Sequence, residues 1–404
     1  MREALRSWHY LKINFNNKQK KQRLRTEDIL MQQKLLSVTK RIRSTPYSRR
    51  VEAAGVKAYT VYNHMLLPTL FDTPEADYYH LCEHVQVWDV SCERQVEICG
   101  PDAARLVQLM TPRDLSKTAL LQGKYAPLCD AQGNILNDPI MIKLADDRWW
   151  ISIADSDIKL WALGLAQGYG LDVNVFEPDV FPLAVQGPKA EELICRIFGE
   201  EAKSIKFFRG KMLAYRGELI YVARSGWSKQ GGFEIYLHKA ELGELLWDDL
   251  FAAGQDLNVG PGYPNGVERI EAGLLSFGSD ITETNNPFEC GLDSYLNLNA
   301  DIESLSLPAL RKISGSITQR LVGIVFDQSV DFSGNANTIG GFDVYHDDRH
   351  IGEVRSQTWS WRYKKHLAMA MIETAYLATN HQVLVGACVG TIHELPFMAE
   401  VLAN

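Results

Sequence analysis

The chain has 404 residues, of which 46% are hydrophobic, and this composition supports a large core spread over two or three domains. Its 42 basic and 50 acidic residues give a formal net charge of −8. Nucleic acids bind basic surfaces, so no nucleic acid is expected as a partner. Because the chain has no uninterrupted apolar stretch of roughly 18 residues, no membrane partner is expected either.

The cysteines point to a reducing compartment. There are seven, at positions 82, 92, 99, 129, 195, 290 and 388, and no two of them form a CxxC pair. An odd, unpatterned set is typical of free thiols rather than of a disulfide framework, so we expect a cytoplasmic protein.

The first thirty residues differ in charge from the rest of the chain. They hold eight Lys or Arg against three Asp or Glu, and no apolar signal-peptide core follows the basic residues. We interpret residues 1–30 as a basic, disordered extension without chemistry of its own, and Met31 as a plausible natural start.

Taken in chain order, helices and strands alternate without a regular parallel repeat. Helices are predicted at the start of 75–88 and over 101–110, 188–198 and 239–254, and strands at the end of 75–88 and over 94–100, 148–154 and 217–227. Residues 125–144 indicate a strand, a turn at AQGN and a second strand. This order favours an α+β fold with antiparallel sheets over residues 31–310.

Beyond about residue 310 the pattern changes to short strands separated by glycine or charged turns. The segments are RLVGIVFD, GGFDVYHD, RHIGEVRS, HLAMAMIE, QVLVGACV and GTIHELPF. Such a run predicts a small separate β-barrel domain over residues 311–404.

The stretch RSGWSKQGGFEIY (224–236) places a tryptophan in a polar, glycine-bearing loop before a strand. Side chains alternate along a strand, so Glu234 and Tyr236 share one face and Phe233 and Ile235 the other. The apolar pair is expected in the core. The polar pair, beside Trp227, forms either one wall of a ligand site or an ordinary solvated edge.

Common catalytic signatures are absent from the sequence. It has no GxSxG, P-loop or HExxH motif. His80 and His84 share a helical face but have no clear third ligand, which is more typical of a solvated helix than of a metal site. We therefore expect no metal and no covalent nucleophile.

Several ordered stretches together resemble one family. They are VWDVSCERQVEICGPDAARLVQLM, GNILNDPIMIKL, PLAVQGPKAEELICRIFG, RSGWSKQGGFEIYL, GVERIEAGLLSFGSDI, NPFECGLD and IGEVRSQTWS. From about residue 40 onward the chain is similar to the aminomethyltransferases, the glycine-cleavage T-protein and its relatives. The resemblance implies a three-domain, cloverleaf-like fold with tetrahydrofolate in a central cavity, and a homodimer is an expectation from the family.

Within that family, RSGWSKQGGFEIY, WWISIADSD and VKAYTVYNHMLLP are most similar to the branch that demethylates dimethylsulfoniopropionate. The implied reaction moves a methyl group from a sulfonium to tetrahydrofolate, giving methylmercaptopropionate and 5-methyltetrahydrofolate. Alternatives are a folate-dependent methyl- or aminomethyltransferase with another donor, and a folate-binding protein without transfer activity. Correct placement of the two reactants can lower the barrier by roughly 7–11 kcal/mol, so no further catalytic machinery is required.

The resemblance also implies roles for individual residues. Asp138 matches the family's important aspartate and is expected to orient the pterin amine and favour the charge it acquires; the alternative is a turn aspartate. Glu234 is expected to accept hydrogen bonds from the pterin. Tyr125, Ser152 and Trp227 are expected to complete the folate site.

For the methyl donor we expect aromatic faces, which attract cations. The candidates are Trp227, Tyr236, Tyr59 and Tyr62, although packing in the core is the favoured interpretation for the last two. Arg269 is expected to hold either a substrate carboxylate or Glu271.

Two departures from the family pattern fall near the C-terminus: Trp361 stands where proline is usual, and 304–316 lacks the glycine that usually precedes the helix. We expect both in the smaller domain.

Overall fold

The structure is a computed structural model that describes residues 39–330, 342–378, 381–398 and 402. The chain divides into two compact units, residues 1–43 and 44–404, and all elements described below belong to the second unit. The predicted extension over residues 1–30 lies outside the described residues.

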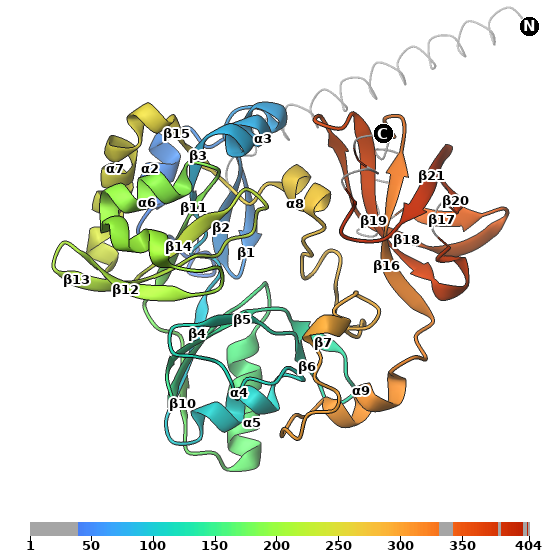
Figure 1. Cartoon of the computed structure of the whole chain (residues 1–404), viewed down its shortest axis with the longest axis horizontal. Coiled ribbons are helices and arrows are strands. Elements are labelled where there is room, and N and C mark those ends of the chain that lie inside the picture. Colours follow the sequence, from blue (N-terminus) through green and yellow to red (C-terminus); the bar gives the residue numbers. More distant parts are fainter. Residues whose placement is uncertain (1–38, 331–341, 379–380, 399–401, 403–404) are drawn as a thin grey trace, which may run out of the picture. The chain divides into compact units, whose positions relative to one another are not determined.

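A six-stranded sheet forms the first part of the folded unit (Figure 1). Its strands lie in the order β12 (Gly210–Tyr215), β13 (Glu218–Ala223), β14 (Gly232–Leu237), β11 (Phe181–Gln186), β3 (Val85–Asp89) and β15 (Val259–Gly262). Neighbours are antiparallel, as predicted, except that β15 runs parallel to β3. A hairpin of β1 (Ala58–Tyr62) and β2 (Met65–Leu70) and the helix α3 (Pro74–Glu83) precede β3.

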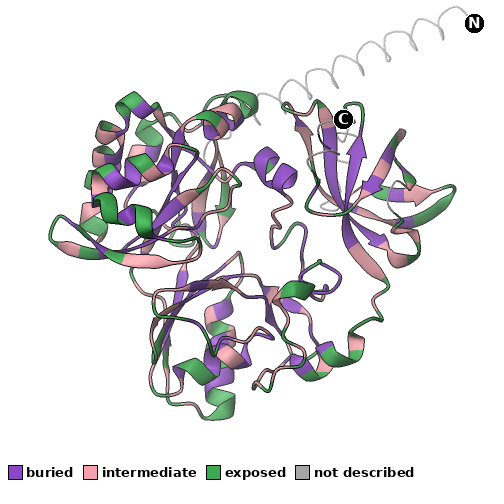
Figure 2. Ribbon diagram, in the orientation of Figure 1, coloured by how far each residue is buried: buried purple, intermediate pink, exposed green. Residues whose placement is uncertain are grey.

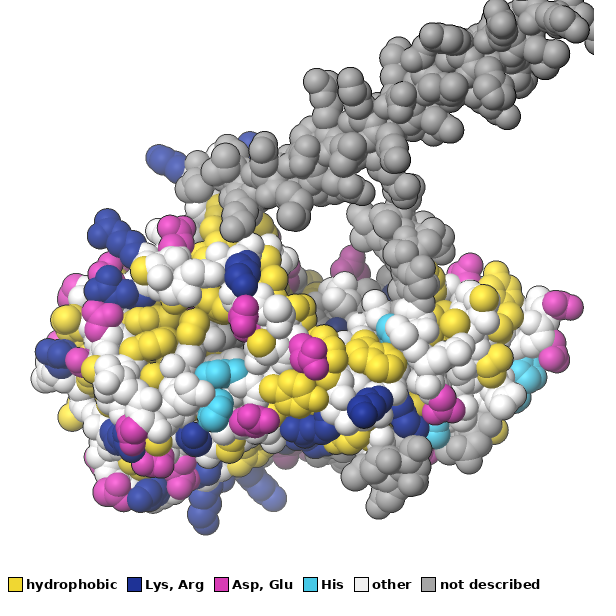
Figure 3. Space-filling model, turned by 90° about the horizontal axis from the view of Figure 1, so that it is seen from above, with side chains coloured by type: hydrophobic (Ala, Val, Ile, Leu, Met, Phe, Trp, Pro, Cys, Tyr) yellow, Lys and Arg dark blue, Asp and Glu magenta, His cyan; other side chains and the backbone are white. Residues whose placement is uncertain are grey.

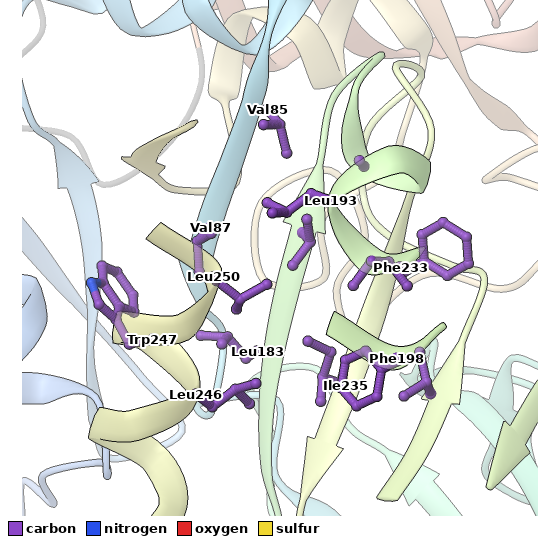
Figure 4. Close-up of a cluster of buried hydrophobic side chains, with 14 of the residues drawn as sticks. Val85, Val87, Leu183, Leu193, Phe198, Phe233, Ile235, Leu246, Trp247 and Leu250 are labelled. Carbon is purple, nitrogen blue, oxygen red and sulfur yellow. The ribbon is translucent and has the colours of Figure 1, made fainter. Parts of the chain in front are cut away.

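One face of this sheet is covered by helices. They are α2 (Ser48–Ala53), α6 (Ala190–Phe198) and α7 (Gly243–Ala253). Figure 4 shows Leu193 of α6 and Leu250 of α7 pointing into the same cluster as Phe233 and Ile235 of β14. The predicted apolar face of β14 is therefore confirmed. Burial of each such side chain contributes about 1.5–3 kcal/mol.

A second, five-stranded sheet is inserted in the chain between β3 and β11. Its order is β10 (Asn174–Phe176), β4 (Gln95–Cys99), β9 (Arg148–Ser152), β8 (Ile140–Ala145) and β5 (Gly123–Tyr125), and α4 (Ala103–Leu109) and α5 (Ile158–Tyr169) supply apolar side chains to its core. The predicted turn at AQGN joins the short paired strands β6 (Leu128–Cys129) and β7 (Ile135–Asn137). Gly133 provides the positive φ (91°) that this turn needs.

The segment before the barrel packs against this second sheet, contrary to expectation. The backbone N–H of Leu305 donates to the carbonyl of Leu109 (3.0 Å), and Leu310 of α9 (Leu307–Ile313) lies against Gly133. The assignment of 304–316 to the smaller domain is therefore wrong, because Leu305 packs against the core of the second sheet and Leu310 lies against the AQGN turn. The predicted domain boundary at 310/311 falls inside α9.

The C-terminal strands close into a barrel, as predicted. Their order is β16 (Gln319–Phe326), β19 (Lys365–Glu373), β18 (Arg349–Ser360), β17 (Asp343–His346), β20 (Gln382–Val385) and β21 (Cys388–His393). Side chains alternate along β16, so that Val322 and Ile324 share the apolar cluster of one face and Leu321 and Val325 that of the other. The last turn lies at Gly386, which has φ 59°, so β21 begins earlier than predicted.

Helix α8 (Gly266–Ala272) is unusual because its charged residues are buried (Figure 2). Glu268, Arg269 and Glu271 are 2%, 8% and 7% exposed. By contrast, Lys and Arg are interspersed with Asp and Glu on the surface shown in Figure 3. Buried charges require partners, and those of α8 are described below.

Candidate active site

Glu234 lies on the face of β14 opposite the apolar core, as predicted, and is buried. Its Oε2 accepts hydrogen bonds from the Ser225 hydroxyl and from the Tyr236 hydroxyl (3.1 Å). Burial raises the pKa of the Glu234 carboxyl, and the two hydrogen bonds oppose that shift only in part. Among the described residues both donors use Oε2, so Oε1 is left to accept from a ligand.

Tyr236 is only 1% exposed, because its ring packs between the two sheets. It stacks on Trp150 of the second sheet, with ring centroids 5.9 Å apart and planes inclined by 25°. The Trp150 indole N–H in turn donates to Glu97 (2.8 Å). The hydroxyl of Tyr236 thus donates its hydrogen bond to Glu234. Direct contact between Tyr236 and a methyl donor stays a prediction.

Asp138 directly follows β7, and the side chain of the preceding residue, Asn137, fixes the backbone at this point. The Asn137 amide donates to the Ala154 carbonyl (3.1 Å) and the Ser156 hydroxyl (2.8 Å), which fixes the backbone beside Asp138. The Tyr125 hydroxyl donates to Asp138 Oδ2 (3.0 Å), so the structure brings these two predicted residues together. Burial raises the pKa of Asp138 to about 7, despite the bond from Tyr125, which lowers it.

The β1–β2 hairpin brings Tyr62 close to Asp138. Its two-residue turn has positive φ at Asn63 (48°) and His64 (63°), as a type I′ turn requires. The Asn63 amide donates to the carbonyls of Cys92 and Ala154 (3.0 Å each), which anchors the turn. Burial raises the pKa of the Tyr62 hydroxyl, and the nearby charges of Glu93 and Asp138 raise it further. Tyr59, by contrast, packs against the core of the first sheet.

Glu93, in the connection from β3 to β4, is a site residue that the sequence analysis missed. Burial raises the pKa of its carboxyl, and the charges of Glu234 and Asp138 add to the shift. We call Glu93, Asp138 and Glu234 the acid cluster. Among the described residues, no side chain donates a hydrogen bond to the Glu93 carboxylate. The only sequence signal was a charged pair, Glu93-Arg94, between two buried strands.

Ser152 supports Glu93 indirectly. The Gln95 side-chain amide donates both to the Ser152 hydroxyl (2.9 Å) and to the backbone carbonyl of Glu93 (2.8 Å). Ser152 is 7% exposed, and its predicted contact with folate remains a prediction.

Trp227 is fixed from the side of α8. Its indole N–H donates to the Leu275 carbonyl (3.2 Å), and the Arg269 guanidinium lies 5.6 Å from its ring centroid. Such a cation–π contact holds the ring in place.

The partners of Arg269 correct one expectation. Its Nη1 pairs with Asp280 (2.6 Å), and its Nη2 donates to the Ser356 hydroxyl (2.7 Å). Glu271 instead accepts from the hydroxyls of Tyr78 (2.7 Å) and Ser360 (2.6 Å). The predicted pairing of Arg269 with Glu271 is therefore wrong, because side chains two residues apart on a helix point away from each other and each finds its own tertiary partners. Binding of a substrate carboxylate by Arg269 stays a prediction.

No metal centre forms among the residues that the structure describes: none of their His, Cys, Asp and Glu side chains gather in threes suited to an ion. His84 Nδ1 lies 3.1 Å from the Lys189 amine, and its ring lies 5.2 Å from that of His80. All seven cysteines are free thiols. Over the described ranges no helix combines the length and apolar character needed to cross a membrane.

Two family descriptions match consecutive parts of the chain. The GCVT N-terminal domain matches residues 47–300, and the glycine cleavage T-protein C-terminal barrel domain matches residues 319–398. The chain belongs to the glycine cleavage T-protein family. The predicted family and fold class are thereby confirmed.

Individual members of the family are also similar. Dimethylsulfoniopropionate demethylase DmdA of Ruegeria pomeroyi is 49% identical over 340 residues, which cover 84% of this chain and 92% of that protein. An aminomethyltransferase of Lysinibacillus sphaericus is 27% identical over 85% of this chain and 94% of its own length. The crystal structure of aminomethyltransferase T from Bartonella henselae has a TM-score of 0.78 at 21% identity, over 88% of this chain and 98% of that one, and supports the fold.

Proposed function

We propose that this protein is a tetrahydrofolate-dependent demethylase of dimethylsulfoniopropionate. The observation that carries the proposal is the 49% identity with the demethylase of Ruegeria pomeroyi, against 27% for the aminomethyltransferase of Lysinibacillus sphaericus. The products are methylmercaptopropionate and 5-methyltetrahydrofolate. A homodimer and a cytoplasmic location stay predictions.

The acid cluster fits such a pair of substrates. Bound tetrahydrofolate supplies the amine that receives the methyl group. Glu234 has Oε1 available for the N–H donors of the pterin, and a carboxylate acceptor makes those hydrogen bonds about twice as strong as neutral ones. The pKa values of Glu93, Asp138 and Glu234 are raised, and a cationic sulfonium nearby would favour the charged forms of these carboxyls.

Asp138 is proposed to accept the proton that the methylated amine loses. During transfer the carbon–sulfur bond breaks, its electron pair stays on the neutral thioether, and the methylated amine must lose a proton. A carboxylate whose pKa is raised to about 7 accepts a proton near neutral pH far better than an ordinary aspartate does. Tyr125 holds Asp138 in place for this role.

The remaining residues are proposed to position the donor. The rings of Trp227 and Tyr62 are proposed as the aromatic surfaces for a sulfonium, each worth about 1–2 kcal/mol when desolvated. Orientation of donor and acceptor then supplies most of the barrier reduction, which is roughly 7–11 kcal/mol for well-aligned reactants.

The proposal is tested by mixing the purified protein anaerobically with tetrahydrofolate and dimethylsulfoniopropionate. We expect methylmercaptopropionate and 5-methyltetrahydrofolate in equal amounts by mass spectrometry, and neither product when folate is omitted. If neither forms although the protein binds tetrahydrofolate, the donor assignment is wrong. A panel of other methyl and aminomethyl donors then separates a different transferase from a folate-binding protein without activity.

A further inference from the structure

The loop that carries Trp227 is held by one short segment of the chain. The backbone N–H of Lys229 donates to Glu268 Oε1 (2.7 Å), and the Gln230 side-chain amide donates to the same oxygen (3.2 Å). Trp227 itself is bound by Leu275 and Arg269, as described above. We call residues 265–275, which supply all of these partners, the α8 platform.

The α8 platform is anchored independently of the loop. The Asn265 side chain accepts from the backbone N–H groups of Val267 (3.0 Å) and Glu268 (3.1 Å), which caps the helix. Arg269 bonds Ser356 and Glu271 bonds Ser360, both on β18 of the barrel. The platform therefore has a fixed position from which it can orient the loop.

Burial of the Glu268 carboxylate on α8 costs free energy of folding. It is 2% exposed, and its Oε2 is buried without a hydrogen-bond partner among the described residues. An apolar side chain of similar size would avoid the desolvation of a carboxylate. Stability of the helix alone does not account for Glu268, whereas its two hydrogen bonds to the Trp227 loop do.

We propose that Glu268 is a positioning residue that sets the affinity for the methyl donor, by holding the loop 227–230 so that Trp227 forms one wall of the donor site. The proposal rests on the proposed function, since it deepens the same site. Glu268 acts through the loop, and Oε1 is the atom responsible.

The central experiment compares Glu268→Leu with Glu268→Gln. Leucine removes the acceptor, and we expect the KM for dimethylsulfoniopropionate to rise about tenfold or more, as when a positioning contact is lost. The Kd for tetrahydrofolate, measured by titration, should stay within about twofold. Glutamine keeps an oxygen for Lys229 and Gln230 and should restore the wild-type KM.

Glu271→Leu is the matched control, because Glu271 lies buried on the same helix but bonds Tyr78 and Ser360 instead of the loop. We expect it to lower the melting temperature without a selective rise in the donor KM. Gln230→Ala should raise the donor KM less than Glu268→Leu, and should add nothing in a Glu268→Leu background.

The proposal is overturned if Glu268→Gln is as impaired as Glu268→Leu, or if Glu268→Leu and Glu271→Leu have the same effect on the donor KM. A second measurement does not depend on turnover. The fluorescence difference between the wild type and Trp227→Phe reports the environment of Trp227, and it should shift in Glu268→Leu but not in Glu268→Gln. If the shift occurs while the protein demethylates nothing, the proposed function fails and the positioning role stands; an absent shift overturns that role.

Discussion

The acid cluster and helix α8 both bury charge, but they do so differently. On α8, Arg269 pairs with Asp280 and Ser356, and Glu271 receives two hydroxyl groups. In the acid cluster, burial raises the pKa of all three carboxyls, and the charges of Glu234 and Asp138 raise that of Glu93 further. Buried charge that finds its partners within the fold supports the scaffold, and we propose that the acid cluster serves the reaction instead.

The largest effect is expected from Asp138→Asn, which removes the proton acceptor and keeps the shape. We expect kcat to fall roughly 10²- to 10⁴-fold, the usual contribution of a positioned acid or base. Single-turnover mass spectrometry measures the rate, and tetrahydrofolate titration is the control, since folate affinity should change little. A variant that keeps the wild-type rate would remove Asp138 from the reaction.

The corresponding change for α8 is Asp280→Asn. It breaks the ion pair with Arg269 and leaves this buried guanidinium without its counter-charge. We expect the free energy of unfolding in urea to fall by about 3–5 kcal/mol. Glu200→Gln breaks a solvent-exposed pair with Lys203 and should leave stability nearly unchanged. Equal effects of the two variants would contradict the scaffold role of the Arg269–Asp280 pair.

Glu234→Gln should weaken tetrahydrofolate binding about 10- to 100-fold, because a hydrogen bond to a charged group contributes roughly 1.5–3 kcal/mol. Ser225→Ala removes one donor to the same carboxylate and serves as the milder comparison. Isothermal titration gives both values. Unchanged folate affinity in Glu234→Gln would exclude this carboxylate as the pterin partner.

The smallest effect concerns pH. Asp138 is protonated below its pKa of about 7 and charged above it, so the rate should rise as pH increases through that range and then level off. A profile that is flat between pH 5.5 and 8.5 at about constant folate saturation would contradict the role of Asp138.

Much of the fold follows from local sequence patterns. The alternation of side chains in FEIY (233–236) correctly predicted the two faces of β14, and AQGN (131–134) correctly predicted a turn. The parallel pairing of β15 with β3 could not be predicted, because the two strands are far apart in sequence and no local pattern specifies that partner.

The ligand contacts of the residues that the family resemblance named stay predictions, and the sequence analysis missed a residue that only the fold brings near them. The bond between Tyr125 and Asp138 joins two predicted residues. Glu93 carries no motif, and its proximity to Asp138 and Glu234 arises from packing of the two sheets. The pairing of Arg269 with Asp280 depends likewise on a loop whose course local propensity does not define.

The position of β3 has a consequence for synthesis on the ribosome. This strand lies between β11, which begins at Phe181, and β15, which begins at Val259, so both of its neighbours emerge long after it. Closing such long loops slows folding, because the stabilisation from strand pairing comes only after the loop has closed. A nascent chain therefore keeps Val85–Asp89 unpaired at least until β11 has been made, and Glu93 and Asp138 meet Glu234 only after the six-stranded sheet begins to close.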